Sequence, residues 1–183
     1  MTIDYLDGKT WAEISREERF FCLVLYTHIE KNPSEFVGFL VEKGVALEPD
    51  QEWQVGYEAC FYRDVLKQKG RDVSATPYSN KRTFDLALFG TEQIVVIEAK
   101  AQQGFKTTQT STFAQDRKDI REVLECDIPV AVVALASSTY FENERKYGKA
   151  GVLKIFDGLI SWKDLHQLYK DPVFEHADQV YRN

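Results

Sequence analysis

The spacing of apolar residues predicts two helices near the N-terminus. The first follows Thr10-Trp-Ala-Glu13, a capping-box pattern, and is expected to end near Asn32-Pro33. The second is expected to begin at Ser34, its N-cap, and to stop at Gly44. Together they predict an N-terminal helical hairpin over residues 1–49.

The pattern changes in the next stretch of the chain. Asp50 to Lys69 has helical spacing and is closed by Gly70, which predicts a third helix. After it the period becomes two, which is typical of strands. The predicted strands are Val73–Thr76, which is weak, Thr83–Phe89 and Gln93–Lys100. Gly90-Thr-Glu92 is a short loop between the last two strands, so we expect three antiparallel strands.

The C-terminal half predicts a helix, a buried strand and a less regular extension. Thr112-Phe-Ala-Gln115 is a second capping-box pattern, for a helix ending near Glu125, and Pro129–Ala136 is apolar throughout. The later signals are a polar and ambiguous segment at 137–149, a candidate strand at Val152–Phe156, and a helix capped by Ser161-Trp-Lys-Asp164 that stops before Asp171-Pro172. Without repeats or linkers, the chain is expected to be one domain, 1–183. We divide it into the hairpin 1–49, a core 50–137 and a C-terminal strand and helix extension 138–183.

Composition supports a folded protein. The chain has 183 residues, 44% hydrophobic and 13% aromatic, which is enough apolar surface for a core. The apolar runs are far shorter than the roughly 20 residues of a membrane span, and no signal-peptide pattern follows Met1, so a cytoplasmic location without membrane contact is expected. Cys22, Cys60 and Cys126 lie far apart and are expected to be reduced thiols.

The net charge of −6 argues at first against a nucleic-acid partner. Residues 1–60, however, carry 5 basic and 12 acidic groups, whereas residues 61–125 carry 11 basic and 9 acidic groups. The acidic excess therefore belongs to the N-terminal third, and the central part of the chain remains compatible with a polyanion.

Several charged residues occupy positions that otherwise favour apolar side chains. Glu58 lies on the apolar face of the predicted third helix, so it needs either a basic partner or a metal ion. Asp85 lies inside an apolar strand, where Asp is unusual. Glu98 and Lys100 end the next strand and, at a spacing of two, point to the same face.

The hairpin brings two of these carboxylates together. Counting outward from the loop, Asp85 and Glu98 are opposite one another or one step apart. Such a pair repels strongly unless a cation lies between the carboxylates, and oxygen ligands suit Mg²⁺ or Mn²⁺.

The tripeptide [D/E]-x-K is a weak signal by itself. It occurs four times, as Asp7-Gly-Lys9, Glu98-Ala-Lys100, Asp116-Arg-Lys118 and Glu144-Arg-Lys146. Only Glu98-Ala-Lys100 ends an apolar strand whose hairpin partner carries a second acid, so it alone is taken as a candidate site.

At these residues the sequence resembles the PD-(D/E)xK nuclease superfamily, over about residues 50–137. The resemblance rests on Asp85, Glu98-Ala-Lys100, the position of Glu58 and the order of elements; Phe84 stands where the family name has Pro. The fold it implies is α/β and restriction-endonuclease-like, an α-β-β-β-α-β core with a mixed central sheet, preceded by the N-terminal helical hairpin.

The resemblance implies metal-dependent hydrolysis of phosphodiester bonds, with DNA as the first candidate substrate. Asp85 and Glu98 would hold Mg²⁺ or Mn²⁺ with the carbonyl of Ala99 and with Glu58, and Lys100 would orient water or stabilise phosphoryl charge. Gln102, if the strand continues, and Lys106, next to a helix N-terminus, are candidate nucleic-acid contacts.

Other interpretations stay open. The chain could be a catalytically inactive nuclease-like fold that binds nucleic acid or protein, or Lys100 could simply neutralise the two acids in a buried ion network. The choice between DNA and RNA, between endonuclease and exonuclease, and between monomer and homodimer is also open.

Overall fold

The computed structural model describes residues 4–148 and 151–181. It is an α/β structure with one five-stranded mixed sheet, whose strands follow sequence order from edge to edge. The strands are β1 (Trp53–Ala59), β2 (Phe84–Gly90), β3 (Ile94–Ala99), β4 (Val130–Ala136) and β5 (Gly158–Ser161). The pairs β1–β2 and β2–β3 are antiparallel, whereas β3–β4 and β4–β5 are parallel.

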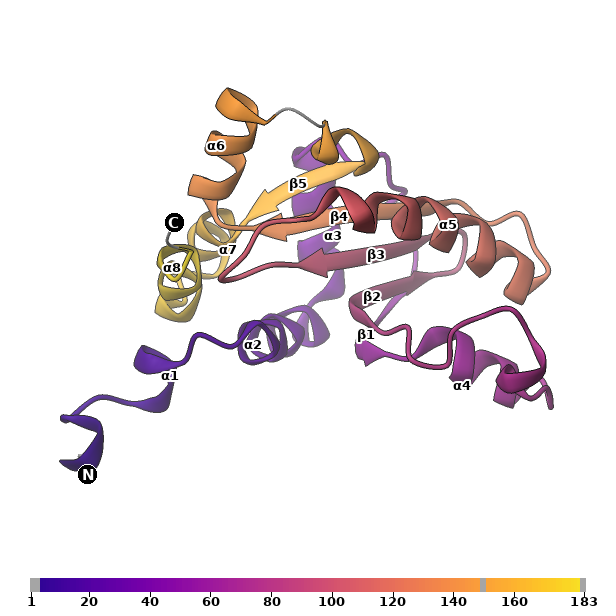
Figure 1. The fold of residues 1–183 in the computed structure, drawn as a ribbon, viewed down its shortest axis with the longest axis horizontal. Coiled ribbons are helices and arrows are strands. Elements are labelled where there is room, and N and C mark those ends of the chain that lie inside the picture. Colours follow the sequence, from indigo (N-terminus) through magenta and orange to yellow (C-terminus); the bar gives the residue numbers. More distant parts are fainter. Residues whose placement is uncertain (1–3, 149–150, 182–183) are drawn as a thin grey trace.

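Helices cover both faces of the sheet (Figure 1). The α-helices are α1 (Trp11–Ile14), α2 (Glu18–Lys31), α3 (Pro33–Glu42), α4 (Phe61–Gln68), α5 (Thr107–Leu124), α6 (Ser138–Tyr147), α7 (Trp162–Tyr169) and α8 (Pro172–Gln179). The short 3-10 helices are η1 (Asp4–Leu6), η2 (Val73–Ala75) and η3 (Val152–Ile155). Within the described ranges, none of the helices combines the length and the hydrophobicity that crossing a membrane requires.

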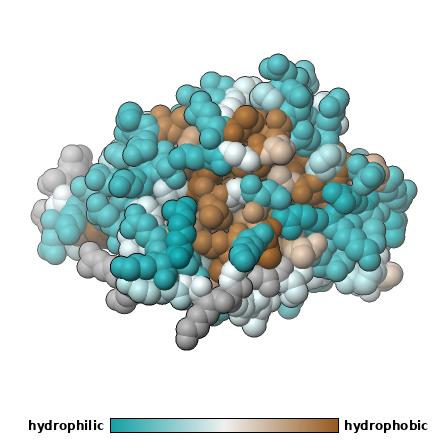
Figure 2. Space-filling model, turned by 90° about the horizontal axis from the view of Figure 1, so that it is seen from above, coloured by the Kyte–Doolittle hydropathy of each residue, from teal (hydrophilic) through white to brown (hydrophobic). Residues whose placement is uncertain are grey.

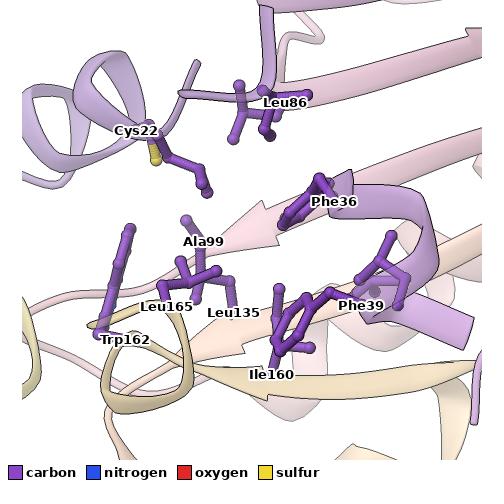
Figure 3. Close-up of a cluster of buried hydrophobic side chains, with 14 of the residues drawn as sticks. Cys22, Phe36, Phe39, Leu86, Ala99, Leu135, Ile160, Trp162 and Leu165 are labelled. Carbon is purple, nitrogen blue, oxygen red and sulfur yellow. The ribbon is translucent and has the colours of Figure 1, made fainter. Parts of the chain in front are cut away.

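The two faces have separate hydrophobic cores. One core joins α2, α3, α7 and α8 to the sheet, and Figure 3 shows side chains of α2, α3, α7 and the strands meeting there. The other joins α4, α5 and α6 to the opposite face. The predicted helical hairpin is therefore not an appendage, because its apolar side chains form one layer of the fold.

β5 is an edge strand of the sheet. Figure 2 views the molecule from that side and shows a hydrophobic area bordered by hydrophilic residues. Exposed apolar areas of this kind often take part in protein contacts, and the homodimer stays a prediction.

The third predicted helix, residues 50–69, is wrong over its first half. Trp53–Ala59 forms β1, and the helix α4 begins only at Phe61. Trp53, Val55 and Tyr57 pack into the same core cluster, so the period of this segment is two. Pairing with β2 over the whole strand overrides its local helical pattern.

The predicted strand Val73–Thr76 is also wrong. Its first three residues form η2, which begins where the Asp72 side chain accepts a hydrogen bond from the Ser74 N–H at 2.9 Å. The three antiparallel strands exist as expected, but β1 is the first of them.

The N-terminal helices differ from the prediction at their ends. The first splits into α1 and α2, with residues 15–17 between them. α3 begins at Pro33, and Asn32 rather than Ser34 is its N-cap. Gly44 has a φ of +89°, a conformation that glycine adopts easily, and it follows the end of α3 as predicted.

The C-terminal half is mostly confirmed. β4 is the predicted buried strand, and α7 begins after Ser161, whose capping box with Asp164 is formed. α5 begins five residues before Thr112, and the candidate strand Val152–Phe156 is wrong because η3 occupies it and β5 follows. The ambiguous segment contains α6, although its last residue, Lys149, lies outside the described residues. All three cysteines are free.

Candidate active site

Three carboxylates lie in one row across the antiparallel strands. The β1–β2 pairs on either side of Glu58 place it opposite Asp85. Continuing the β2–β3 register by one residue beyond the pair Leu86–Ile97 places Asp85 opposite Glu98. Glu58 therefore belongs to a strand and not to a helix, but the sheet still brings it beside the other two candidates.

Glu98 is a buried acid on the α5 side of β3. Its neighbours at alternate positions, Ile94 and Val96, belong to the core on that side, and Glu98 itself is only 5% exposed. Arg82, just before β2, donates from Nη2 to the Oε1 atom of Glu98. Burial and then the charge of Asp85 raise the pKa of Glu98 to about 7, although Arg82 works in the opposite direction.

Asp85 on β2 is hydrogen-bonded to the end of the neighbouring strand β3. Its Oδ2 atom accepts a hydrogen bond of 2.8 Å from the main-chain N–H of Ala99. This bond fixes the carboxylate at the carboxyl end of β3, where the polar residues of the site gather.

Lys100 follows the end of β3 and turns toward α2. Its Nζ atom donates to Glu18 Oε1 at 3.1 Å and to the carbonyl of Ala99. Burial opposes the charge of Lys100, but the nearby Glu18 and Asp85 outweigh it and raise the pKa of the ammonium above its ordinary value. Lys100 is therefore a fixed, charged group beside the acids.

Glu18 is a residue of the site that the sequence interpretation missed, as it also missed Arg82 and Asp116. It is the first residue of α2, and its Oε2 atom also accepts a hydrogen bond from the Ala101 N–H at 3.1 Å. Burial and the charge of Asp85 raise the pKa of Glu18, although Lys100 lowers it. The spacing Ser15-Arg-Glu-Glu18 matches a capping box and was the available signal for a helix start here.

Glu58 lies at the edge of the site in an unusual backbone conformation. Its φ is +48°, which a residue with a side chain rarely adopts within a strand. Its Oε1 atom lies 3.3 Å from Arg19 Nε, in a pair whose arginine side chain is 78% exposed. A strained residue at this position is a common sign of a functional site.

The two predicted nucleic-acid contacts lie outside the strand. β3 ends at Ala99, so Gln102 does not continue its face, and it bonds with Arg16 instead: Gln102 Nε2 lies 2.9 Å from the Arg16 carbonyl. Arg16, Glu18, Lys100 and Gln102 are among the residues that line a pocket of about 250 Å³. Lys106 is exposed at the start of α5.

The charges of the buried and partly buried groups at the site do not balance. Four carboxylates and two cations form two connected groups: Glu18 with Lys100 and Asp85, and Glu98 with Arg82 and Asp116. Their formal charge is −2 when all are ionised. Carboxylate oxygens are the ligands that Mg²⁺ and Mn²⁺ prefer, and a divalent ion would neutralise this excess.

Within the described residues, however, no three His, Cys, Asp or Glu side chains are already arranged to hold a metal ion. The donor chemistry and the charge fit such an ion, while Glu98 faces Arg82 and Glu18 faces Lys100. Comparison with protein-family models, with curated proteins and with solved structures finds no match to this chain.

Proposed function

We propose that this protein is a divalent-metal-dependent nuclease that hydrolyses phosphodiester bonds of DNA. The observation that carries the proposal is the clustering of Asp85, Glu98 and Lys100 at the end of β3. With the neighbouring Glu18, Arg82 and Asp116, these groups have a formal excess of two negative charges when all are ionised. A hard cation is the simplest partner for such a cluster.

The order of elements also supports the resemblance to the PD-(D/E)xK nucleases. Helices α2 and α3, strands β1, β2 and β3, helix α5 and strand β4 follow one another as α-β-β-β-α-β, with α4 inserted after β1. The leading helices are the predicted hairpin and not residues 50–69, so the restriction-endonuclease-like core would include the N-terminal third of the chain.

The residues then take distinct roles. Asp85 and Glu98 would hold Mg²⁺ or Mn²⁺, with Glu58 next in the row, and the bound ion would supply Lewis-acid activation of water and phosphate. Lys100 would stabilise the charge that develops on the phosphoryl oxygens. Glu18 holds the Lys100 ammonium in place by their ion pair.

The test is cleavage of plasmid and single-stranded DNA with Mg²⁺ or Mn²⁺. Asp85→Asn and Lys100→Gln should abolish metal-dependent cleavage. Lys118→Gln is the matched control, because Lys118 ends another [D/E]-x-K tripeptide but is 68% exposed on α5. Cleavage that needs no metal, or that both site variants retain, would refute the proposal.

A second candidate is an inactive nuclease-like fold that binds nucleic acid or a protein. The observation in its favour is that Glu98 and Lys100 each already have a partner of opposite charge, Arg82 and Glu18. For this function, DNA binding without cleavage, unchanged in Asp85→Asn, is the expected result.

A further inference from the structure

Arg82 is held firmly by contacts that do not involve the candidate metal ligands. Its Nε and Nη2 atoms donate to Asp116 Oδ2 at 3.0 and 2.6 Å, and Nη1 donates to the Thr83 carbonyl at 3.0 Å. The rings of Phe84 and Phe113 lie 4.9 and 5.7 Å from the guanidinium carbon. The position of Arg82 is therefore set by β2 and α5.

The orientation of the Glu98 carboxylate depends on Arg82, whereas Arg82 has other contacts that hold it. Among the described residues, Arg82 is the hydrogen-bond donor to the Glu98 carboxylate, and it binds only Oε1. The neighbours of Glu98 at alternate positions of β3 belong to the apolar core on the α5 side, and Asp85 and Lys100 act on it through their charges. The orientation of this carboxylate thus follows from the fixed guanidinium.

Asp116 neutralises the positive charge of Arg82 in this arrangement. A lone arginine next to Glu98 would repel a divalent cation. Asp116 is 3% exposed and neutralises Arg82, and the Tyr62 hydroxyl donates to Asp116 Oδ1 at 2.7 Å. Arg82 can therefore orient Glu98 without adding net positive charge to the site.

We propose that Arg82, neutralised by Asp116, is a positioning residue that holds Glu98 ready to bind the divalent cation; this inference rests on the proposed nuclease function. Carboxylates that bind metals are commonly held by a second layer of hydrogen bonds, and loss of such a partner lowers metal affinity by about 10- to 100-fold. Arg82 and Asp116 lie 34 positions apart, so no sequence motif connects them.

The experiment measures metal binding without nucleic acid. Mn²⁺ binding is followed by electron paramagnetic resonance and Mg²⁺ binding by calorimetry, for the whole chain and its variants. Arg82→Gln should weaken Mn²⁺ binding by about 10-fold or more. Arg82→Lys, which keeps the charge and a donor nitrogen but not the planar fork, should restore part of it. Asp116→Asn should also weaken binding, because it leaves the charge of Arg82 unbalanced.

Arg117→Gln is the matched control. Arg117 is the next residue of α5 after Asp116 and also pairs with an aspartate, Asp157, at 2.7 Å. It donates to Asp157 and to the Ile155 carbonyl and not to Glu98. Its loss should lower the melting temperature and leave Mn²⁺ affinity unchanged. If Arg82 had only a structural role, Arg82→Gln would also lower the melting temperature and leave Mn²⁺ affinity unchanged.

The outcomes separate the two proposals. Wild-type affinity in folded Arg82→Lys and Arg82→Gln variants, or tighter binding in either, would refute the positioning role while the nuclease proposal stands. A wild-type chain that binds Mn²⁺ no better than Glu98→Gln would refute both.

Discussion

Glu18 and Lys100 lie 82 positions apart in the chain, and an ion pair of 3.1 Å joins them at the end of β3. Glu18 reaches this place because α2 begins there, after the break that separates it from α1. The most acidic third of the chain therefore supplies a side chain to the candidate site, and it restrains the one lysine that follows the paired carboxylates.

This pair leads to the first prediction. Glu18→Gln should reduce metal-dependent cleavage by about 10- to 100-fold, because the Lys100 ammonium loses its charged partner while Gln can still accept the bond from the Ala101 N–H. Single-turnover cleavage rates measure the effect. Glu17→Gln changes the neighbouring exposed acid and should cleave at the wild-type rate. Equal cleavage rates in the two variants would show that Glu18 does not contribute to cleavage.

The second prediction concerns pH. The pKa of Glu98 is about 7 in the folded protein and near 4.5 when the group is free, so the folded state binds the proton more tightly. This contribution to stability is complete below about pH 4.5 and is lost as the pH rises through about 7. The Glu98→Gln variant has no titrating group at this position, so its stability lacks this dependence on pH.

Urea unfolding without metal at pH 5 and pH 8 tests this prediction. The stability of Glu98→Gln relative to wild type should be higher at pH 8 than at pH 5, by at most about 3 kcal/mol. Other titrating groups are common to both proteins and cancel in the comparison. A difference that does not change with pH would mean that Glu98 is ionised throughout.

The third prediction is that Mg²⁺ or Mn²⁺ stabilises the protein. At a metal concentration about 100 times Kd, the gain should be about 3 kcal/mol, seen as a higher melting temperature that chelation reverses. Asp85→Asn should lose this gain, although its side chain can still accept the bond from the Ala99 N–H. Asp72→Asn, at the exposed start of η2, should keep it. A gain of the same size in all three proteins would place the ion elsewhere.

The sequence predicted the parts of the fold whose local and long-range preferences agree. β4 is apolar at every position, and Ser161 caps α7 with its own neighbours, so both could be recognised from their local sequence. The helix predicted over Trp53–Ala59 was wrong because this segment becomes a strand by pairing with β2, which lies more than twenty residues later. The apolar spacing of this segment is compatible with a helix, and only pairing with β2 makes it a strand.

The same distinction applies to the site. The hairpin loop was enough to place Asp85 beside Glu98, since register follows from counting along two adjacent strands. Arg82 and Asp116 could not be predicted in this way, because their contact joins a loop to a helix across a packed face. Residues that support a site from a different element leave no spacing in the sequence.

The last prediction concerns the backbone of Glu58. A φ of +48° costs a residue with a side chain about 1 kcal/mol or more, which glycine avoids. Glu58→Gly should therefore raise the unfolding free energy by about 1 kcal/mol and yet reduce metal affinity and cleavage, since it removes the carboxylate from the row beside Asp85. Glu125→Gly is the control, because Glu125 has a φ of +60° at the end of α5. It should gain similar stability with unchanged activity, whereas full activity in Glu58→Gly would mean that the strained conformation serves no function in the site.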